Sequence, residues 1–172
     1  AVQAYSVHRD AAALRSTLTP RAAQVALMYG VLFHSLDEQG LIDCLDRLQL
    51  HTLQRWPVRR RVQESLSLLR APPTWTDTEL RTLADTHWLR LVFTLMQAIE
   101  PASQAEALKA RAQALGVADE PLPRLAGGGD LRALGVSPGP AYGELLARLR
   151  KAQAEGRVSD HEGALALLRS WL

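Results

Sequence analysis

Residues 76–99 read TDTELRTLADTHWLRLVFTLMQAI and carry the most apolar helical pattern in the chain. Thr76 and Glu79 stand three positions apart at its start, which is the spacing of a capping box, where each side chain accepts a hydrogen bond from the other residue's backbone N–H. We therefore expect one continuous helix over this stretch, placed centrally in the core because apolar side chains recur along it at helical spacing. The expected core side chains are Trp88, Leu91, Val92, Leu95 and Met96.

Helical patterns also fill the rest of the chain, and no segment shows the period-two alternation of a half-buried strand. Thr19 is expected to cap a helix that has Pro20 in its first turn. Gly116 stands where a glycine commonly ends a helix. The fold class predicted from these patterns is all-α, with a multi-helix body followed by a small helical tail. The expected helices cover residues 20–35, 37–50, 57–70, 77–99, 101–116, 130–134, 141–155 and 160–171.

The expected helix at 37–50 places Leu41, Leu45 and Leu48 on one apolar face. Cys44 lies beside that face, and a buried, unreactive thiol is the expected environment. As the single cysteine, it excludes an internal disulfide and a cysteine-based zinc site.

Residues 119–129 contain two prolines and three glycines, which is typical of a linker. We expect a hinge or linker there, between a helical body over 1–118 and a helical, RNA-binding tail over 130–172. Ser159 and Glu162 repeat the capping-box spacing and predict the start of the last helix.

The composition is that of a folded protein, with 47% apolar and 22% charged residues among 172. No window of about 18 uncharged apolar residues occurs, so no membrane partner is expected. No secretory signal pattern is visible, and a cytoplasmic location is expected. The net charge is only +2, but arginine supplies 18 of the 20 basic residues. Because arginine is a good phosphate ligand, the positions of these residues matter more than the total.

No catalytic or metal-binding motif is found in the sequence. The histidines are scattered, without the His-x-x-x-His spacing of a metal site. The Asp-x-Asp pair that holds two metal ions in nucleotide transfer is missing as well. We therefore predict no catalytic residue, no metal ligand and no cofactor site in this chain.

Residues 134–143, LGVSPGPAYG, predict a stiff turn between two helices. Pro138 and Pro140 restrict the backbone, while Gly139 and Gly143 leave it without side-chain bulk. Free N–H groups at the positive end of the following helix would suit a phosphate oxygen. The basic side chains expected behind the turn are Arg148, Arg150, Lys151 and Arg157. A plain connector between helices is the alternative interpretation.

A second basic cluster contains Arg55, Arg59, Arg60, Arg61 and Arg70, and Glu64 is the only acidic residue between positions 51 and 70. Such clusters often contact nucleic acid, although a solvated helix face has the same composition. The RNA-binding residues predicted from both regions are Pro138, Gly139, Gly143, Arg148, Lys151, Arg55, Arg59 and Arg60.

The tail also carries an ordered series of motifs. These are Gly128-Gly129-Asp130-Leu131, Gly135-Val136-Ser137-Pro138-Gly139-Pro140, Gly143, Leu145-Leu146, Glu155-Gly156-Arg157-Val158 and Ala164-Leu165. Over residues 128–172 this series resembles the C-terminal tail of bacterial-class CCA-adding tRNA nucleotidyltransferases and the related poly(A) polymerases. A weaker resemblance to their helical body covers residues 25–69, through Leu32-Phe33-His34 and Leu45-Asp46-Arg47-Leu48.

The catalytic head motifs of that family are missing from this sequence. The resemblance therefore implies the body and tail of such an enzyme, or a relative without the head, whose partner is the backbone of tRNA on the elbow or T-arm side. Mg²⁺ and CTP or ATP would bind a separate N-terminal catalytic domain. CCA, CC, A or poly(A) addition by the parent enzyme all remain open.

Two other functions fit the same residues. A helix-hairpin-helix module also grips nucleic-acid backbone with a glycine-containing turn, without reading sequence. A helical domain for protein interaction needs no nucleic acid at all.

Overall fold

The computed structural model describes residues 18–70, 74–99 and 103–172, and within these ranges it contains nine helices and no strand. The all-α fold class is thus confirmed. The expected helix start at Pro101 and the break at Pro72 lie outside the described residues. The helices are α2 Arg21–Phe33, α3 Glu38–Arg47, α4 Val58–Leu69, α5 Asp77–Thr86, α6 Leu89–Ile99, α7 Ser103–Ala114, α8 Gly128–Ala133, α9 Pro140–Ala154 and α10 His161–Arg169.

The expected single helix over 77–99 is two helices, so this prediction is wrong. His87 adopts an extended conformation (φ −116°, ψ 150°) and ends α5, and α6 begins two residues later. Trp88 lies at the break and packs edge-on against Trp56, with ring centroids 5.7 Å apart. The break turns α5 away from α6. Helix α5 therefore packs in a hydrophobic core with α7, while Trp88 packs against a different core that includes α2, α3 and α4.

Of the three serine or threonine caps expected from the sequence, one is confirmed and two differ. The capping box at α5 is confirmed, with Thr76 N donating to Glu79 Oε2 at 2.7 Å. At α2 the N-cap is Pro20 rather than Thr19, and no side chain caps the helix. At α10 the cap is Asp160, whose carboxylate accepts from Gly163 N at 2.8 Å, in place of the expected Ser159. The helix therefore begins one position later than expected, because the Asp160 carboxylate makes the capping bond that was expected from the Ser159 hydroxyl.

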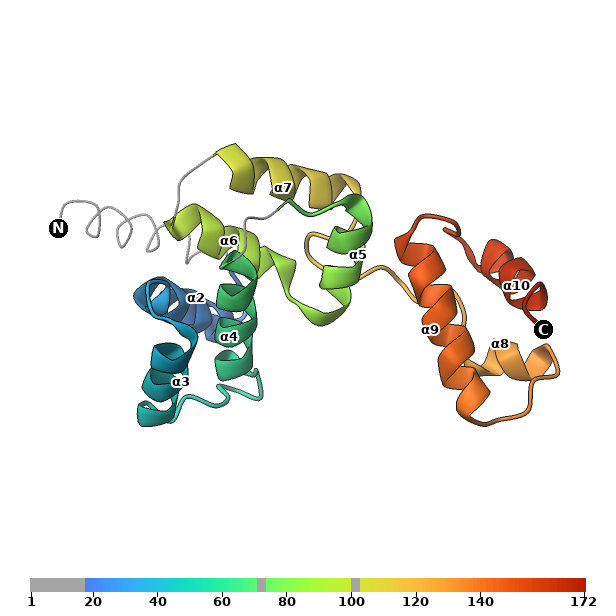
Figure 1. Ribbon diagram of the computed structural model, residues 1–172, viewed down its shortest axis with the longest axis horizontal. Helices are drawn as coiled ribbons and strands as arrows, with labels where there is room; N and C mark the ends of the chain where they lie inside the picture. The colour runs from blue at the N-terminus through green and yellow to red at the C-terminus, as the bar shows by residue number, and fades with distance from the viewer. Residues whose placement is uncertain (1–17, 71–73, 100–102) are drawn as a thin grey trace.

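Three separate hydrophobic cores hold the described helices together. The first lies among α2, α3, α4 and α6, and the second among α5, α6 and α7. Helix α6 serves both, because Leu91 and Leu95 enter the first core while Leu89 and Phe93 enter the second. The third core belongs to α8, α9 and α10. We call α2–α7 the body and α8–α10 the tail; the tail lies at one end of the elongated molecule (Figure 1).

The three side chains of the expected apolar face at 37–50 differ in environment. Leu41 and Leu45 are buried in the first core, as expected. Leu48 is 51% exposed, because α3 ends at Arg47 and the chain turns there. Cys44 is half-buried against the same core.

The chain passes from the body to the tail over a very short distance. Leu122 packs on the second core and Leu125 on the third, so the change of core falls at Pro123 and Arg124. This point lies within the segment expected to be a linker, and α8 begins inside the same segment, at Gly128. A hinge motion there stays a prediction.

No helix in the described part of the chain is long and apolar enough to cross a membrane.

Candidate nucleic-acid interface

The turn between α8 and α9 is built by local hydrogen bonds. Gly135 ends α8 in the left-handed region at φ 83°, and its N–H donates to Arg132 O at 3.0 Å. Val136 N donates back to Leu131 O at 3.0 Å. The Tyr142 hydroxyl then donates to Val136 O at 3.0 Å, which ties the first turn of α9 to the end of α8. The turn is therefore held from both sides.

The N-terminus of α9 is exposed and uncapped. Gly139 is the N-cap and makes no side-chain hydrogen bond, and Pro140 occupies the first turn. Tyr142 N donates to Gly139 O at 3.0 Å, whereas the N–H of Ala141 has no hydrogen-bond acceptor among the described residues. A Cβ placed on Gly139 or Gly143 would meet no atom within 4 Å. Pro138, Gly139 and Gly143 therefore border open space, and the helix end is accessible to an anion.

The basic residues of α9 and of the loop that follows it divide into two kinds. Lys151 is exposed and forms no ion pair within the described residues, and the Arg148 guanidinium lies over the Trp171 ring, with Cζ 4.2 Å from the ring centroid. Arg150 pairs with Asp85 of α5, and Arg157 pairs with Glu155 at 2.8 Å. Of the four basic residues expected behind the turn, Arg148 and Lys151 are thus the two that have no carboxylate partner in the part of the chain that the structure describes.

The second basic cluster is largely neutralised inside the body. Arg59 pairs with Asp46 of α3. Arg60 and Arg61 share Glu64, at 2.5 and 3.1 Å. A count of charges along residues 51–70 leaves out the acidic side chains of α3, which lie outside that range. One of them is Glu38, whose carboxylate lies 3.8 Å from the Arg70 guanidinium.

Arg55 differs from the rest of that cluster. It is exposed, without an ion pair among the described residues, and it sits with Gln54 in a tight turn where both φ angles are positive, at 66° and 52°. Leu53 and Trp56 close this turn with reciprocal N–H to O bonds of 2.9 Å. The structure does not bring this turn to the α9 turn, because the two lie apart along the long axis of the molecule (Figure 1).

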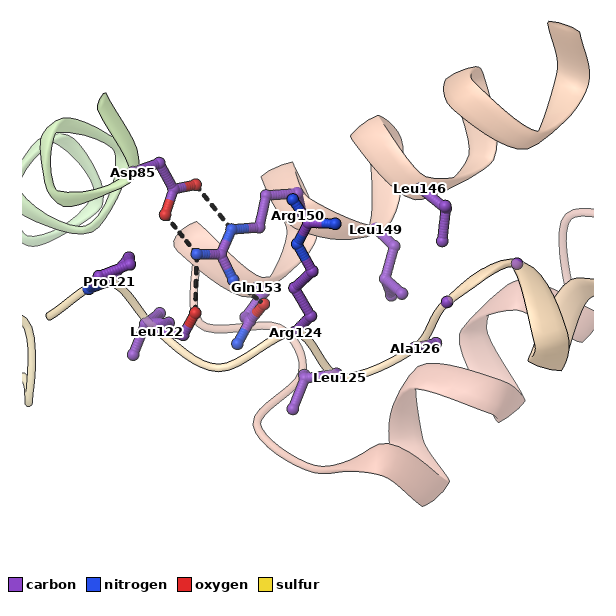
Figure 2. A pocket seen from close by; sticks show the side chains of 12 residues that line it. Asp85, Pro121, Leu122, Arg124, Leu125, Ala126, Leu146, Leu149, Arg150 and Gln153 are labelled. Atoms are coloured by element: carbon purple, nitrogen blue, oxygen red, sulfur yellow. Dashed lines mark hydrogen bonds and ion pairs between the residues drawn. The ribbon is translucent and has the colours of Figure 1, made fainter. Parts of the chain in front are cut away.

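A cavity of about 450 Å³ lies between α9 and the segment that joins body and tail. Figure 2 shows Arg124, Arg150 and Gln153 among its lining, together with leucines of both walls. Sequence reasoning missed this site, because Asp85 and Arg150 are 65 positions apart and no local pattern joins them.

Metal-ligating side chains do not gather anywhere in the described ranges, where no group of three or more His, Cys, Asp or Glu residues could hold an ion. Comparison of the chain with models of known protein families, with curated proteins and with solved structures gave no match.

Proposed function

We propose that this chain binds RNA through its tail, with the α8–α9 turn and the exposed face of α9 against the sugar–phosphate backbone. The observation that supports this most directly is the uncapped N-terminus of α9, which is exposed at Gly139 beside the N–H of Ala141, a donor without an acceptor among the described residues. Arg148 and Lys151 follow on the same helix, and neither has a carboxylate partner within residues 18–70, 74–99 and 103–172. A positive helix end and unpaired cations are suited to phosphate groups.

The proposed RNA is tRNA, bound through its backbone on the elbow or T-arm side. The support for this choice is the series of motifs over residues 128–172, which resembles the tail of CCA-adding enzymes. A-form RNA is recognised mainly by shape and backbone, which suits a rigid turn better than a sequence-reading helix. The chain would then be the body and tail of a nucleotidyltransferase in which a separate catalytic domain binds Mg²⁺ and CTP or ATP.

In this proposal the tail carries most of the binding and the body contributes little charge. Arg59 and Arg60 are committed to carboxylates, so within the second cluster Arg55 is the best remaining candidate. By itself the chain should transfer no nucleotide. Incorporation of labelled CTP or ATP into tRNA by the purified 172-residue chain would contradict this expectation.

The test is tRNA affinity across a salt series. The variant Arg148→Ala/Lys151→Ala should bind more weakly, and its salt slope should fall by roughly 0.7 to 0.9 for each phosphate that the protein no longer neutralises. The matched control is Arg47→Ala/Lys109→Ala, which removes the same charge from α3 and α7 of the body. Equal slopes for wild type and the tail variant would refute a role of α9 in binding phosphate.

A helix-hairpin-helix module is the second candidate, because α8 and α9 are two helices joined by a glycine-containing turn. Competition between tRNA and duplex DNA separates the two proposals. Preference for tRNA supports the first, and equal competition supports the second. A protein-interaction domain predicts binding that barely responds to salt.

A further inference from the structure

The guanidinium of Arg150 uses all five of its N–H donors. Nε donates to Asp85 Oδ2 at 2.6 Å, and one Nη2 bond reaches the other carboxylate oxygen. The second Nη2 bond goes to Leu122 O at 2.8 Å. Nη1 donates to Pro123 O at 3.3 Å and to Gln153 Oε1 at 2.8 Å. One side chain of α9 thereby joins α5, the connecting segment and its own helix (Figure 2).

Arg150 lies where the apolar packing of the molecule is interrupted. The side chains of the tail form their own core, separate from both cores of the body. The contacts between α5 and α9 include a second polar one, in which Arg81 Nη1 donates to Ala154 O at 3.1 Å near the C-terminus of α9. That helix end is negative, so it attracts the arginine. The junction between body and tail is thus bridged by charged and polar groups.

We propose that the Asp85–Arg150 ion pair is a latch that holds the tail in one orientation on the body. Removal of this pair frees the tail to rotate about Pro123 and Arg124, where the chain passes from one core to the next. The two side chains are only 25% and 27% exposed, so water is a poor substitute for the bonds between them. The guanidinium and the carboxylate form a bidentate pair, which fixes the relative orientation of the two groups as well as the distance between them.

The two partners of the latch have different roles. Removal of Asp85 releases the body but leaves the Arg150 bonds to Leu122, Pro123 and Gln153 available, so the connecting segment stays attached to α9. Removal of Arg150 breaks its bonds to both Asp85 and the connecting segment, which leaves the Gln153 Nε2 bond to Pro123 O and the Arg81 bond to Ala154 O. Arg150→Lys keeps the charge but lacks the planar fork, so a latch that depends on geometry should open in that variant as well.

The test goes beyond RNA binding and needs no RNA. Spin labels at Ala110→Cys in α7 and Ala166→Cys in α10, in a Cys44→Ala background, report the distance between body and tail by double electron–electron resonance. Both labelled positions are exposed. The distance distribution should be narrow in the otherwise unchanged protein. It should broaden, with a second population, in Asp85→Asn and more so in Arg150→Lys.

Asp77→Asn is the matched control, because Asp77 lies on the same helix and pairs with Arg111 inside the body, at 2.5 Å. Its distribution should stay narrow, and circular dichroism should show unchanged helix content in every variant. Unchanged widths in both latch variants would overturn the proposal, as would equal broadening in the control. Failure of the wild type to bind tRNA would count against the proposed function alone, since these distances are measured without RNA.

Discussion

Arg148 and Trp171 join α9 to the last residues of the chain. The guanidinium carbon lies 4.2 Å from the centroid of the indole ring, within cation–π range. Trp171 is also packed against the core of the tail, so the ring is itself held in place. The contact therefore restrains an exposed cation of α9 without neutralising it, as a carboxylate would.

Trp171→Leu should loosen Arg148 while keeping an apolar side chain in the core. A cation–π contact at an exposed site contributes about 0.5–1 kcal/mol, which corresponds to a factor of about two to five in an equilibrium constant. A double-mutant cycle of Trp171→Leu and Arg148→Ala, measured by urea unfolding, should give a coupling free energy of that size. Additive effects of the two changes would show that the ring and the cation do not interact.

Gly135 and Gly139 should respond differently to alanine. Gly135 has φ 83°, so Gly135→Ala should lower the free energy of unfolding by about 1–2 kcal/mol. Gly139 has φ 168°, which is extended backbone, and its surroundings are empty. Gly139→Ala should therefore change stability by no more than about 0.5 kcal/mol, as at other surface sites. Urea unfolding of both variants checks this, and equal losses would mean that the turn is strained at both glycines.

Arg59 should act as a structural residue rather than as an RNA ligand. Arg59→Gln breaks the pair with Asp46 and should lower the free energy of unfolding by no more than about 1 kcal/mol, since exposed ion pairs contribute little. The salt slope of tRNA binding should not change. Arg55→Gln is the comparison, because Arg55 has no carboxylate partner among the described residues. A flatter slope for Arg59→Gln would show that RNA displaces Asp46.

The capping box of α5 should make stability depend on pH. Hydrogen bonds from the backbone N–H of Thr76, and then from its hydroxyl, lower the pKa of Glu79 from its ordinary value of 4.5. A carboxyl with a lowered pKa in the folded state stabilises the fold above pH 4.5, and that contribution is lost as the pH falls through the lowered value. The stability difference between wild type and Glu79→Gln should therefore shrink between pH 7 and pH 3, as measured by thermal unfolding. Glu144→Gln on α9 controls for the change in net charge, and a Glu79 difference that is constant with pH would contradict the prediction.

Sequence alone was sufficient where structure depends on neighbours within one turn of helix. The all-α class, the capping box at Thr76 and the helix-ending glycine at 116 follow from local sterics and hydrogen bonding, which need no knowledge of distant residues. The turn before α9 belongs to the same group, because prolines restrict the backbone directly and glycines permit conformations that other residues avoid. RNA binding at that turn stays a prediction.

Only the tertiary structure decided which charges remain available and where the long helix breaks. Arg59 and Arg150 were both counted as free basic residues, and each is neutralised by a carboxylate that arrives from another helix, 13 and 65 positions away. The break at His87 lets α5 pack on the second core while Trp88 and Leu91 pack in the first, although the apolar pattern runs on without interruption. The hydrophobic periodicity of the sequence shows which side chains are apolar, and its composition shows which are charged. Neither shows which side chain each of them contacts. The partner of each side chain is set by packing between segments that are distant in sequence. This is why the candidate interface contracted from two basic clusters to the start of α9, Arg148 and Lys151, with Arg55 remaining from the second cluster.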